Sequence, residues 1–475
     1  MQRKEYKVML AVTFLNILII PICICIGAFL LPAQYNNTFL GELKYKYERL
    51  EETKGKRIIL VGGSSVAFGV DSKLLGESFP KYTVVNFGMY AGLGSEVMLD
   101  LSEKKIRKGD IVIFSPEQNK QTLSNYFNAQ NMWQAVDGDF SLLSNIDKED
   151  MKQMIGRLPY FSADKWNYFY KNRTPYITGV YSRKSFDAYG DIVSDCKANI
   201  MTDGYDKNTP IRLDKSVLDK KFVASVNTYI DHLNAKGATV WYHFCPMNER
   251  AVQKEDDVDA YYSFLQKQLH CYIIGNPNNS IFDAGWFYDT NFHLNSKGKQ
   301  VNTRQMIRDI KAMLGDTSVT NITIPKEPQL ETESEKANEI SGDNRDAAYF
   351  TYKQADGRMT LCGLTKSGQK KNNLIVPVSY KGKQIKSLES NIFAGNDKIQ
   401  TITIQENILS ISDGAFKDCS HLKYIYVKNK QPQNCMVGQH LLNGTKADII
   451  VDSSVLSAYR LSYFWSGYAD RIASK

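Results

Sequence analysis

Six apolar positions near the C-terminus recur at one fixed spacing, and this period constrains the fold more than any other feature of the chain. A period in the twenties with many fixed apolar positions is typical of a solenoid, in which each coil buries its apolar face against its neighbours. The sequence therefore predicts a C-terminal repeat domain over residues 347–475. The six positions Ile385, Leu388, Phe393, Ile399, Ile402 and Ile404 return 23 residues later as Ile408, Ile411, Phe416, Leu422, Ile425 and Val427.

A second pattern, short β-branched or aromatic runs separated by room for helices, occupies the middle of the chain. The runs lie at residues 58–61, 84–86, 111–114 and 239–244, and apolar spacing predicts a last helix from Ser296, which can cap it, to about Leu314. Buried parallel strands with crossover helices have this pattern. We expect an α/β domain with a doubly wound parallel sheet at 56–315. An aromatic-rich insertion at about 119–215 either covers a local hydrophobic cluster or stacks on sugar rings.

The N-terminus carries basic residues followed by an uncharged apolar run at residues 8–31. As a helix the run would rise about 36 Å, and a bilayer core is about 30 Å thick. Positive charge precedes the run, and none follows it until Lys44. The sequence therefore predicts a single-pass membrane anchor at 1–35, with the N-terminus cytoplasmic and the bulk of the chain extracytoplasmic, followed by a stalk at 36–55.

Composition narrows the function classes. The chain has 475 residues, of which 43% are hydrophobic and 23% charged, so it can bury more than one core. A net charge of +8 is small for this length, and we expect no nucleic-acid partner. The stretch 316–346 carries eight acidic and three basic side chains, which predicts an acidic linker. The cysteines show no metal-ligand spacing, and we expect neither a metal nor a cofactor.

A glycine-rich turn after the first predicted strand holds the candidate nucleophile. The strand at 58–61 runs into Gly62 and Gly63, and a serine on such a turn, Ser64, can project its hydroxyl above the sheet. A phosphate cradle or an ordinary tight turn would use the same glycines, but neither GxxxxGK nor GxGxxG is present.

Histidine is scarce, with six in the chain, and one of them precedes the last predicted helix. The loop "FYDTNFHLNSKGKQ" holds Asp289 and His293, and its histidine can approach the tip of the first strand. There it would act as the base for Ser64, with an acidic partner fixing its tautomer. Three other histidines, His232, His243 and His270, are expected at helix or strand surfaces.

These residues resemble the SGNH (GDSL-like) hydrolase family. The turn "VGGSSVAFGV" is similar to its nucleophile block, "VVNFGMYAGLG" to its glycine block, and "DTNFHL" to its Asp and His block. The resemblance implies a flavodoxin-like fold, Ser64 as nucleophile, His293 as base and Asp289 as its orienting acid. It also implies oxyanion donors from the backbone of Ser64 and of Gly88 or Gly92.

Two departures from the family pattern stand out. The family acid lies three residues before the histidine, whereas Asp289 lies four before His293. The GxND block is replaced by Ser115, Pro116, Glu117, Gln118 and Asn119, where Asn119 could serve as the oxyanion side chain only with a rearranged backbone. Glu117 is either a pocket residue or a solvated loop carboxylate.

The C-terminal repeats resemble the BspA-type leucine-rich repeats of bacterial surface proteins. The segment "AFKDCSHLKYIYV", residues 415–427, carries the repeat pattern, and the last residues are similar to the terminal cap of that family, so the resemblance covers about 350–475. In such repeats the position of Cys419 is interior, and its thiol belongs to the core.

Two functions follow from these resemblances. The first is a membrane-anchored, extracytoplasmic acyl esterase or acyltransferase acting on cell-envelope glycans or teichoic-acid-like polymers, similar in layout to the family needed for teichoic-acid D-alanylation. The alternative is a non-catalytic surface-binding or adhesion protein that uses the leucine-rich repeats, with a protein partner there. The sequence leaves the acyl group, the acceptor and the oligomeric state open.

Overall fold

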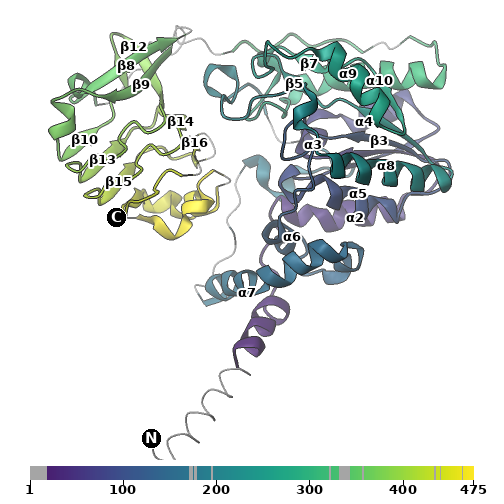
Figure 1. Cartoon of the computed structure of the whole chain (residues 1–475), viewed down its shortest axis with the longest axis horizontal. Helices are drawn as coiled ribbons and strands as arrows, with labels where there is room; N and C mark the ends of the chain where they lie inside the picture. The colour runs from purple at the N-terminus through teal and green to yellow at the C-terminus, as the bar shows by residue number, and fades with distance from the viewer. Residues whose placement is uncertain are drawn as a thin grey trace, which may run out of the picture.

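The chain forms an α/β body followed by a smaller repeat region built mainly of short strands (Figure 1). The two are joined by the segment in which the acidic linker is expected, and residues 331–342 of that segment lie outside the described part. The computed structural model describes residues 19–170, 175, 179–193, 196–319, 322–330, 343–355, 358–432, 435–438, 440–462 and 464–474.

The α/β body is organised by a parallel sheet of five strands in the order β2-β1-β3-β4-β6. All four strands expected from the sequence are present, and the short edge strand β6 is an addition to them. Because the order reverses between β1 and β3, a crevice opens outside the carboxyl ends of these two strands. The strands are β1 (Arg57–Gly62), β2 (Thr83–Gly88), β3 (Ile111–Ser115), β4 (Thr239–His243) and β6 (Tyr272–Ile274).

Helices cover both faces of this sheet, because alternate residues of each strand point to opposite sides. In β1, Ile59 and Val61 pack into one core cluster, whereas Ile58 and Leu60 pack into another. The first cluster is covered by α5 (Ser95–Glu103) and α8 (Lys220–Ala235). The second is covered by α3 (Ser64–Gly69), α4 (Ser72–Ser78) and α10 (Ser296–Leu314). The rest of the body holds α9 (Val258–Gln268), β5 (Met247–Asn248) and β7 (Ile281–Phe282).

The last helix of the body, α10, has the bounds expected from the sequence, but its cap differs. The capping residue is Asn295 and not Ser296, because the Asn295 side chain accepts from the backbone N–H groups of Lys297 and Gly298. An amide oxygen at this position satisfies two N–H groups that have no partner within the helix. The loop that carries His293 is therefore fixed where it enters α10.

Residues expected to form a stalk instead form a helix of the α/β body. In α2 (Leu43–Glu52), Leu43 and Leu50 are fully buried in the first core cluster. Lys46 is buried as well, and its ammonium donates to the carbonyl oxygens of Asn86 and Gly190 at 3.0 and 2.6 Å. Burial lowers the pKa of Lys46 to about 7.

The predicted membrane anchor is contradicted by the structure. Residues 8–18 of the expected span lie outside the described part of the chain, and residues 19–25 form a helix that continues as a π-helical turn, Ile26–Leu30. None of the described helices is long and apolar enough to cross a bilayer. The end of this segment instead packs against a helix of the insertion, where Lys165 donates to the carbonyl oxygen of Ala28 at 3.2 Å. The single-pass topology expected from the sequence is therefore wrong.

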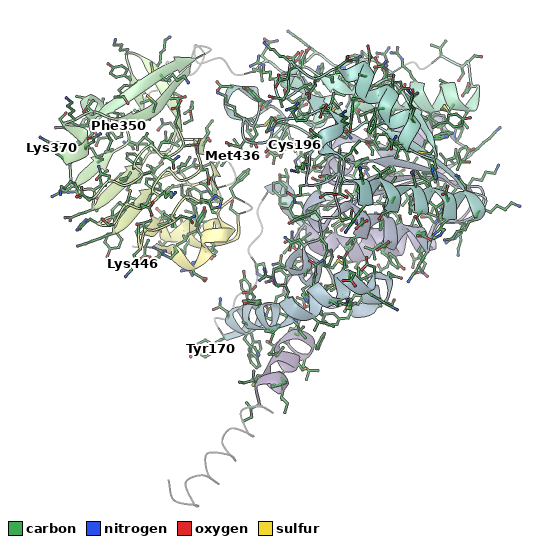
Figure 2. All side chains as sticks on the ribbon, viewed as in Figure 1. Tyr170, Cys196, Phe350, Lys370, Met436 and Lys446 are labelled. Carbon is green, nitrogen blue, oxygen red and sulfur yellow. The ribbon has the colours of Figure 1, made fainter. Side chains whose placement is uncertain are left out.

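The aromatic-rich stretch expected as an insertion contains α6 (Ala129–Ala135) and the long helix α7 (Lys148–Tyr170). Trp133 of α6 stacks on Phe161 of α7 with ring centroids 5.3 Å apart, and both side chains are buried. Tyr170, at the end of α7, is exposed (Figure 2). These inner aromatic residues thus form a local hydrophobic cluster, one of the two uses considered for this stretch.

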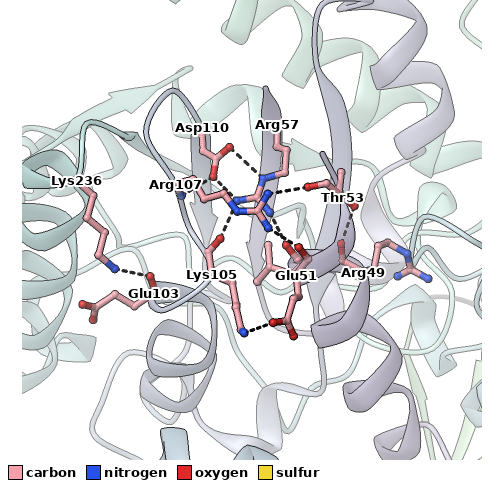
Figure 3. A network of polar contacts seen from close by, with 10 residues as sticks. Arg49, Glu51, Thr53, Arg57, Glu103, Lys105, Arg107, Asp110 and Lys236 are labelled. Carbon is pink, nitrogen blue, oxygen red and sulfur yellow. Dashed lines mark hydrogen bonds and ion pairs between the residues drawn. The ribbon is translucent and has the colours of Figure 1, made fainter. Parts of the chain in front are cut away.

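A buried ion pair joins the start of β1 to the residue before β3 (Figure 3). Arg57 Nε donates to Asp110 Oδ1 at 3.0 Å, and its Nη2 pairs with Asp110 Oδ2. The same guanidinium donates to the carbonyl oxygens of Leu50, at the end of α2, and of Lys105, at 2.8 Å for the latter. One side chain therefore ties α2, β1 and the loop before β3 together.

The repeat region is a solenoid whose coils follow the sequence period. Leu388 pairs with Ile411, and Ile402 pairs with Ile425, each 23 positions further along. The Phe393 and Phe416 rings of successive coils stack with centroids 5.3 Å apart. One sheet holds β10 (Asn373–Ile375), β13 (Thr401–Ile404), β15 (Tyr424–Val427), β17 (Asp448–Val451) and β18 (Ile472–Ser474). The other holds β16 (Met436–Val437), β14 (Ser410–Ile411), β12 (Lys383–Leu388), β9 (Arg358–Leu364) and β8 (Phe350–Ala355), with β11 (Ser379–Tyr380) on β12.

The core of the solenoid is closed at its end by α12 (Leu456–Leu461) and the following turn. Trp465 is buried there and donates from its ring to the carbonyl oxygen of Cys435 at 2.9 Å. Cys419 is fully buried, as its place in the repeat predicts, and its Sγ lies 3.0 Å from the carbonyl oxygen of Phe393. Burial raises the pKa of the Cys419 thiol to about 11, so it remains a protonated core residue at neutral pH.

Candidate active site

Ser64 stands at the carboxyl end of β1, where the chain turns directly into α3. The turn needs glycine, because a Cβ at Gly62 would lie 2.4 Å from the carbonyl oxygen of Ser115 on the neighbouring strand β3. At Gly63 a Cβ would lie 2.9 Å from a carboxylate oxygen of Glu117. The two glycines thus let the backbone approach β3 closely, and Ser64 follows at the crevice above the sheet.

His293 and Asp289 are far from Ser64 in sequence, on the loop before α10, but the fold brings their side chains to it. His293 Nε2 lies 2.7 Å from Ser64 Oγ, and His293 Nδ1 lies 2.8 Å from Asp289 Oδ1. All three side chains are buried. With the carboxylate accepting from Nδ1–H, Nε2 is left as the acceptor for the Ser64 hydroxyl proton. The structure therefore brings together the three residues that the sequence proposes as nucleophile, base and acid.

A tight turn places Asp289 correctly despite its spacing of four residues. Thr290 Oγ1 accepts from the backbone N–H groups of Phe292 and His293 at 3.2 and 3.0 Å. The backbone N–H of Tyr288 donates to the carbonyl oxygen of His293 at 2.8 Å, which closes the loop. These bonds fold the loop back on itself, so the Asp289 carboxylate faces the ring of the histidine it precedes.

Two aromatic residues hold this pair from other elements. The ring of Phe68, on α3, stacks on the imidazole of His293 with centroids 4.1 Å apart and planes inclined by 5°. The hydroxyl of Tyr181, in the insertion, donates to Asp289 Oδ2, the carboxylate oxygen that His293 does not use. Stacking on Phe68 thus holds the plane of the His293 imidazole, and hydrogen bonds to both oxygens hold the Asp289 carboxylate.

The expected oxyanion donors are only partly brought to the site. The backbone N–H of Gly88 donates to the side-chain oxygen of Asn86 at 2.9 Å. This N–H is therefore already used in a hydrogen bond and does not donate to an oxyanion. Gly92 and Asn119 line the same cavity as Ser64. The Asn119 side-chain oxygen accepts from the backbone N–H of Thr122 at 2.8 Å, which orients its amide.

Glu117 is a pocket residue and not a solvated loop carboxylate. It lies two residues beyond β3, is 7% exposed, and lines the cavity beside Ser64. Its Oε1 accepts from the backbone N–H of Ser65 at 3.1 Å and lies 3.2 Å from Ser64 Oγ. The Ser64 hydroxyl therefore has two acceptors within reach, and the contact to His293 is the shorter.

The cavity above these residues has a volume of about 720 Å³, within the range of small-molecule binding sites. Its lining is mixed, with hydroxyl, amide and charged groups among aromatic rings. Across the described residues, no group of three or more His, Cys, Asp and Glu side chains is arranged to hold a metal ion. The lining includes Tyr90, Lys120, Tyr181, Asp206, Asn208, Thr209, Arg212 and Phe292.

Comparison with known families identifies the C-terminal part of the chain. The family model of the BspA type leucine rich repeat region matches residues 373–456, with six copies of the repeat. The chain therefore carries a BspA-type leucine-rich repeat region. This result confirms the resemblance expected from the repeat period and from the segment 415–427. The comparisons give no evidence for an SGNH hydrolase domain, so that resemblance stays a prediction.

Similarity to solved structures is weak in all three cases considered. A leucine rich cell surface protein of Faecalibacterium prausnitzii shares 13% identity over 23% of this chain and 33% of its own, with a TM-score of 0.17. A leucine-rich repeat protein of Bacteroides ovatus shares 18% over 22% of this chain and 37% of its own, with a TM-score of 0.17. Protein YXIM of Bacillus subtilis shares 13% over 56% of this chain and 59% of its own, with a TM-score of 0.27.

The chain spans about a third of the length of the two repeat proteins that it matches. No curated protein sequence matches it. The family match covers the repeats and no residue of the α/β body.

Sequence reasoning missed the two aromatic residues that hold the Asp289–His293 pair. Phe68 carries a signal, because it lies four residues after Ser64 in a segment that forms a helix, a spacing that places both side chains on one face. Tyr181 carries none, since it belongs to the irregular part of the insertion and reaches Asp289 only through the tertiary fold.

Proposed function

We propose that the α/β body is a serine-dependent acyl esterase or acyltransferase of the SGNH (GDSL-like) type, acting on acylated cell-envelope glycans or teichoic-acid-like polymers. The observation that carries the proposal is the hydrogen-bonded series Asp289, His293 and Ser64 at a cavity above the carboxyl ends of β1 and β3. Acyl transfer needs a hydroxyl, a base that can take its proton and a group that fixes the base, and these residues meet that need.

In the first half of the proposed reaction, Ser64 Oγ attacks the carbonyl carbon of the ester while His293 Nε2 takes the hydroxyl proton. The bond from that carbon to the alcohol oxygen then breaks, and His293 returns the proton to the leaving oxygen. The acyl group is left on Ser64 as an ester. Asp289 stabilises the imidazolium that forms between these two proton transfers.

In the second half, water or a hydroxyl of a second glycan attacks the acyl group and gives its proton to His293. The bond to Ser64 breaks, and the Ser64 oxygen takes the proton back. Water completes an esterase cycle and a glycan hydroxyl completes a transferase cycle. The negative oxygen of each tetrahedral intermediate needs donors, for which we propose the backbone N–H groups of Ser64 and Gly92 and the amide of Asn119.

Labelling by a serine-directed fluorophosphonate tests this function directly. The purified chain should be labelled, Ser64→Ala should not be, and His293→Ala should be labelled at least 100-fold more slowly, because the hydroxyl then lacks its base. Ser65→Ala is the matched control, since Ser65 is the next residue but its hydroxyl is buried and bonds to no described group. Labelling of Ser64→Ala at the wild-type rate would rule the proposal out.

The second candidate function is surface binding or adhesion through the leucine-rich repeats. The family match over residues 373–456 favours it, because such repeats stack into an extended surface. Along β15 the residues alternate, with Ile425 and Val427 buried and Tyr424 and Tyr426 half-exposed. This outer row is the face on which we propose that a protein or glycan partner binds.

The two functions make opposite predictions for the same variants. If the protein functions by surface binding through the repeats, Tyr424→Ser together with Tyr426→Ser should weaken retention of the chain on bacterial cell walls. Ser64→Ala should leave this retention unchanged. If the protein functions as an esterase or acyltransferase through Ser64, release of acetate from acetylated oligosaccharides should be lost in Ser64→Ala. It should be retained in the double tyrosine variant.

A further inference from the structure

The cavity above Ser64 has one wall that does not come from the α/β body. Met436 and Phe464, both in the repeat region, line it together with Ser64 and His293. Figure 2 shows Met436 on the side of the repeat region that faces the α/β body. Two segments far apart in sequence thus enclose one space, with the reactive hydroxyl on one side and the end of the solenoid on the other.

Both wall residues are held firmly by the solenoid. Met436 begins β16, the edge strand of its sheet, where its backbone N–H donates to the carbonyl oxygen of Leu409 at 2.9 Å. Phe464 packs against the repeat core and precedes the buried Trp465, whose ring N–H is bonded within that core. The two side chains are half-buried, so part of each faces the cavity.

The chemistry of the cavity points to a hydroxyl-rich ligand larger than an acyl group. Besides the two residues of the repeat region, the lining includes Asn208, Thr209 and Arg212, which contribute amide, hydroxyl and charged groups. Aromatic rings such as those of Tyr90 and Phe464 line the same cavity and offer flat apolar faces. Sugar rings present the matching surface, with polar edges and apolar faces, and a volume of about 720 Å³ holds more than one small group.

We propose that the repeat region supplies the wall of the Ser64 site that faces the sugar part of the substrate, so that Met436 and Phe464 contact the sugar units of an acylated oligosaccharide farthest from the ester. This inference rests on the proposed acyl esterase or acyltransferase function and adds to it a role for the repeats in binding the sugar part of the substrate. The α/β body then performs the chemistry on the acyl group, and the repeat region determines which acyl carriers reach it.

Enlarging one side chain of this wall tests the proposal without changing Ser64, His293 or Asp289. Met436→Trp places a larger side chain at the cavity. Ser387→Trp is its control, because Ser387 lies two strands away on the same sheet, about 10 Å from Met436. Rates are measured with two acetyl esters, p-nitrophenyl acetate and an acetylated oligosaccharide of five sugar units. Thermal unfolding of both variants shows whether the repeat region keeps its fold.

For Met436→Trp we expect KM for the acetylated oligosaccharide to rise at least fivefold, with kcat unchanged. Hydrolysis of p-nitrophenyl acetate and fluorophosphonate labelling of Ser64 should stay at the wild-type rate, and Ser387→Trp should match the wild type throughout. Equal effects on the two esters, or no effect on either, would overturn the proposed wall while leaving the function of Ser64 intact.

A binding measurement separates this inference from the proposed function. The acetylated oligosaccharide is titrated into Ser64→Ala, which cannot turn it over, and into the same chain with Met436→Trp added. Weaker binding in the second chain supports the wall even if no labelling of Ser64 is seen. Equal binding to both chains, or no binding to either, overturns it.

Discussion

At the scale of single residues, the orientation of Asp289 depends on a hydroxyl from another part of the chain. Tyr181 donates to the oxygen of Asp289 that His293 leaves unused. A hydrogen bond to a charged group contributes roughly 1.5–3 kcal/mol. Tyr181→Phe should therefore slow acylation of Ser64 about 10-fold or more. KM should stay unchanged, because the phenol bonds to Asp289 and acts on His293 through that carboxylate.

The measurement is the rate of fluorophosphonate labelling, followed together with kcat and KM for an acetyl ester. Tyr229→Phe is the matched control, since Tyr229 is also a buried tyrosine with a hydroxyl partner, Ser102, but lies in α8 away from the site. A rate that Tyr181→Phe leaves unchanged would show that His293 is oriented without this bond.

A residue of the site could be predicted from the sequence only where the neighbouring residues point to it. Ser64 follows a glycine turn after a strand, and His293 is one of few histidines and precedes a capped helix, so both stand out in the sequence. The sequence left Glu117 open between two alternatives and gave no signal for Tyr181, because their contacts to Ser64 and Asp289 arise only when β3 and the insertion are placed in the fold. His243, expected at a surface, is buried against Asp309 for the same reason.

At the scale of elements, the buried pair Arg57–Asp110 holds the start of the central strand. Both side chains are almost fully buried, and Arg57 has two further carbonyl partners. Removing one member of such a pair leaves an uncompensated buried charge, which costs about 3–5 kcal/mol. Asp110→Ala should lower the free energy of unfolding by that amount. The control Glu51→Ala removes a more exposed partner, that of Lys105, and should cost less than about 1 kcal/mol.

Urea denaturation of the two variants, followed by far-ultraviolet circular dichroism, provides the comparison. The denaturation midpoint of the α/β body should fall clearly in Asp110→Ala and hardly at all in Glu51→Ala. Similar midpoints for both would mean that Leu50 and Lys105 alone satisfy the guanidinium of Arg57.

A cluster of carboxylates between α5 and α7 should make stability depend on pH. Burial, reinforced by Asp147 and Glu96, raises the pKa of both Asp100 and Asp150 to about 7. In the unfolded chain these groups ionise near pH 4, so between about pH 4 and 7 the folded state binds more protons. Stability contributed by these protonated groups is therefore lost as the pH rises through this window.

Asp150→Asn removes one of these groups and should stabilise the chain at pH 8 by roughly 1 kcal/mol, allowing for partial solvent screening. The gain should shrink toward pH 5, where the wild-type carboxyl is protonated in the folded state. Glu149→Gln is the control, because Glu149 is exposed on the same helix and should change little at either pH. Thermal unfolding at the two pH values measures both, and a gain in Asp150→Asn that is larger at pH 5 would contradict the assignment.

Elements with a strong apolar pattern were predictable, and those defined by contacts were not. The four central strands and α10 follow from continuous β-branched runs and from helical spacing. Residues 43–52 carry many charges and were expected to lie in a stalk, yet Leu43 and Leu50 give them a buried face. The N-terminal apolar run predicted a membrane span because its composition fits one, but the pattern could not show that Lys165 of α7 bonds to its end.

At the scale of the whole molecule, the chain contains separate hydrophobic cores. Two core clusters lie on the faces of the five-stranded sheet, and another, formed by the repeats, shares no residue with them. The sequence predicted this division, because the period of the repeats and the alternation of the α/β body are different patterns. It could not predict that Met436 and Phe464 line the cavity of Ser64, since the acidic segment between the two parts carries no information on how they meet.

Separate cores should unfold in separate steps. Leu60→Ala in β1 and Ile425→Ala in β15 each remove buried methyl groups from one core only, at an expected cost of about 2–5 kcal/mol. Scanning calorimetry of the full chain should then show two transitions, of which Leu60→Ala lowers one and Ile425→Ala the other. Because the two parts meet at a cavity and not through a shared core, neither variant should shift the transition of the other part by more than a few degrees. A single transition that both variants lower equally would mean that the repeat region and the α/β body fold as one unit. Met436 and Phe464 would then be held in place relative to Ser64 by the same cooperative structure.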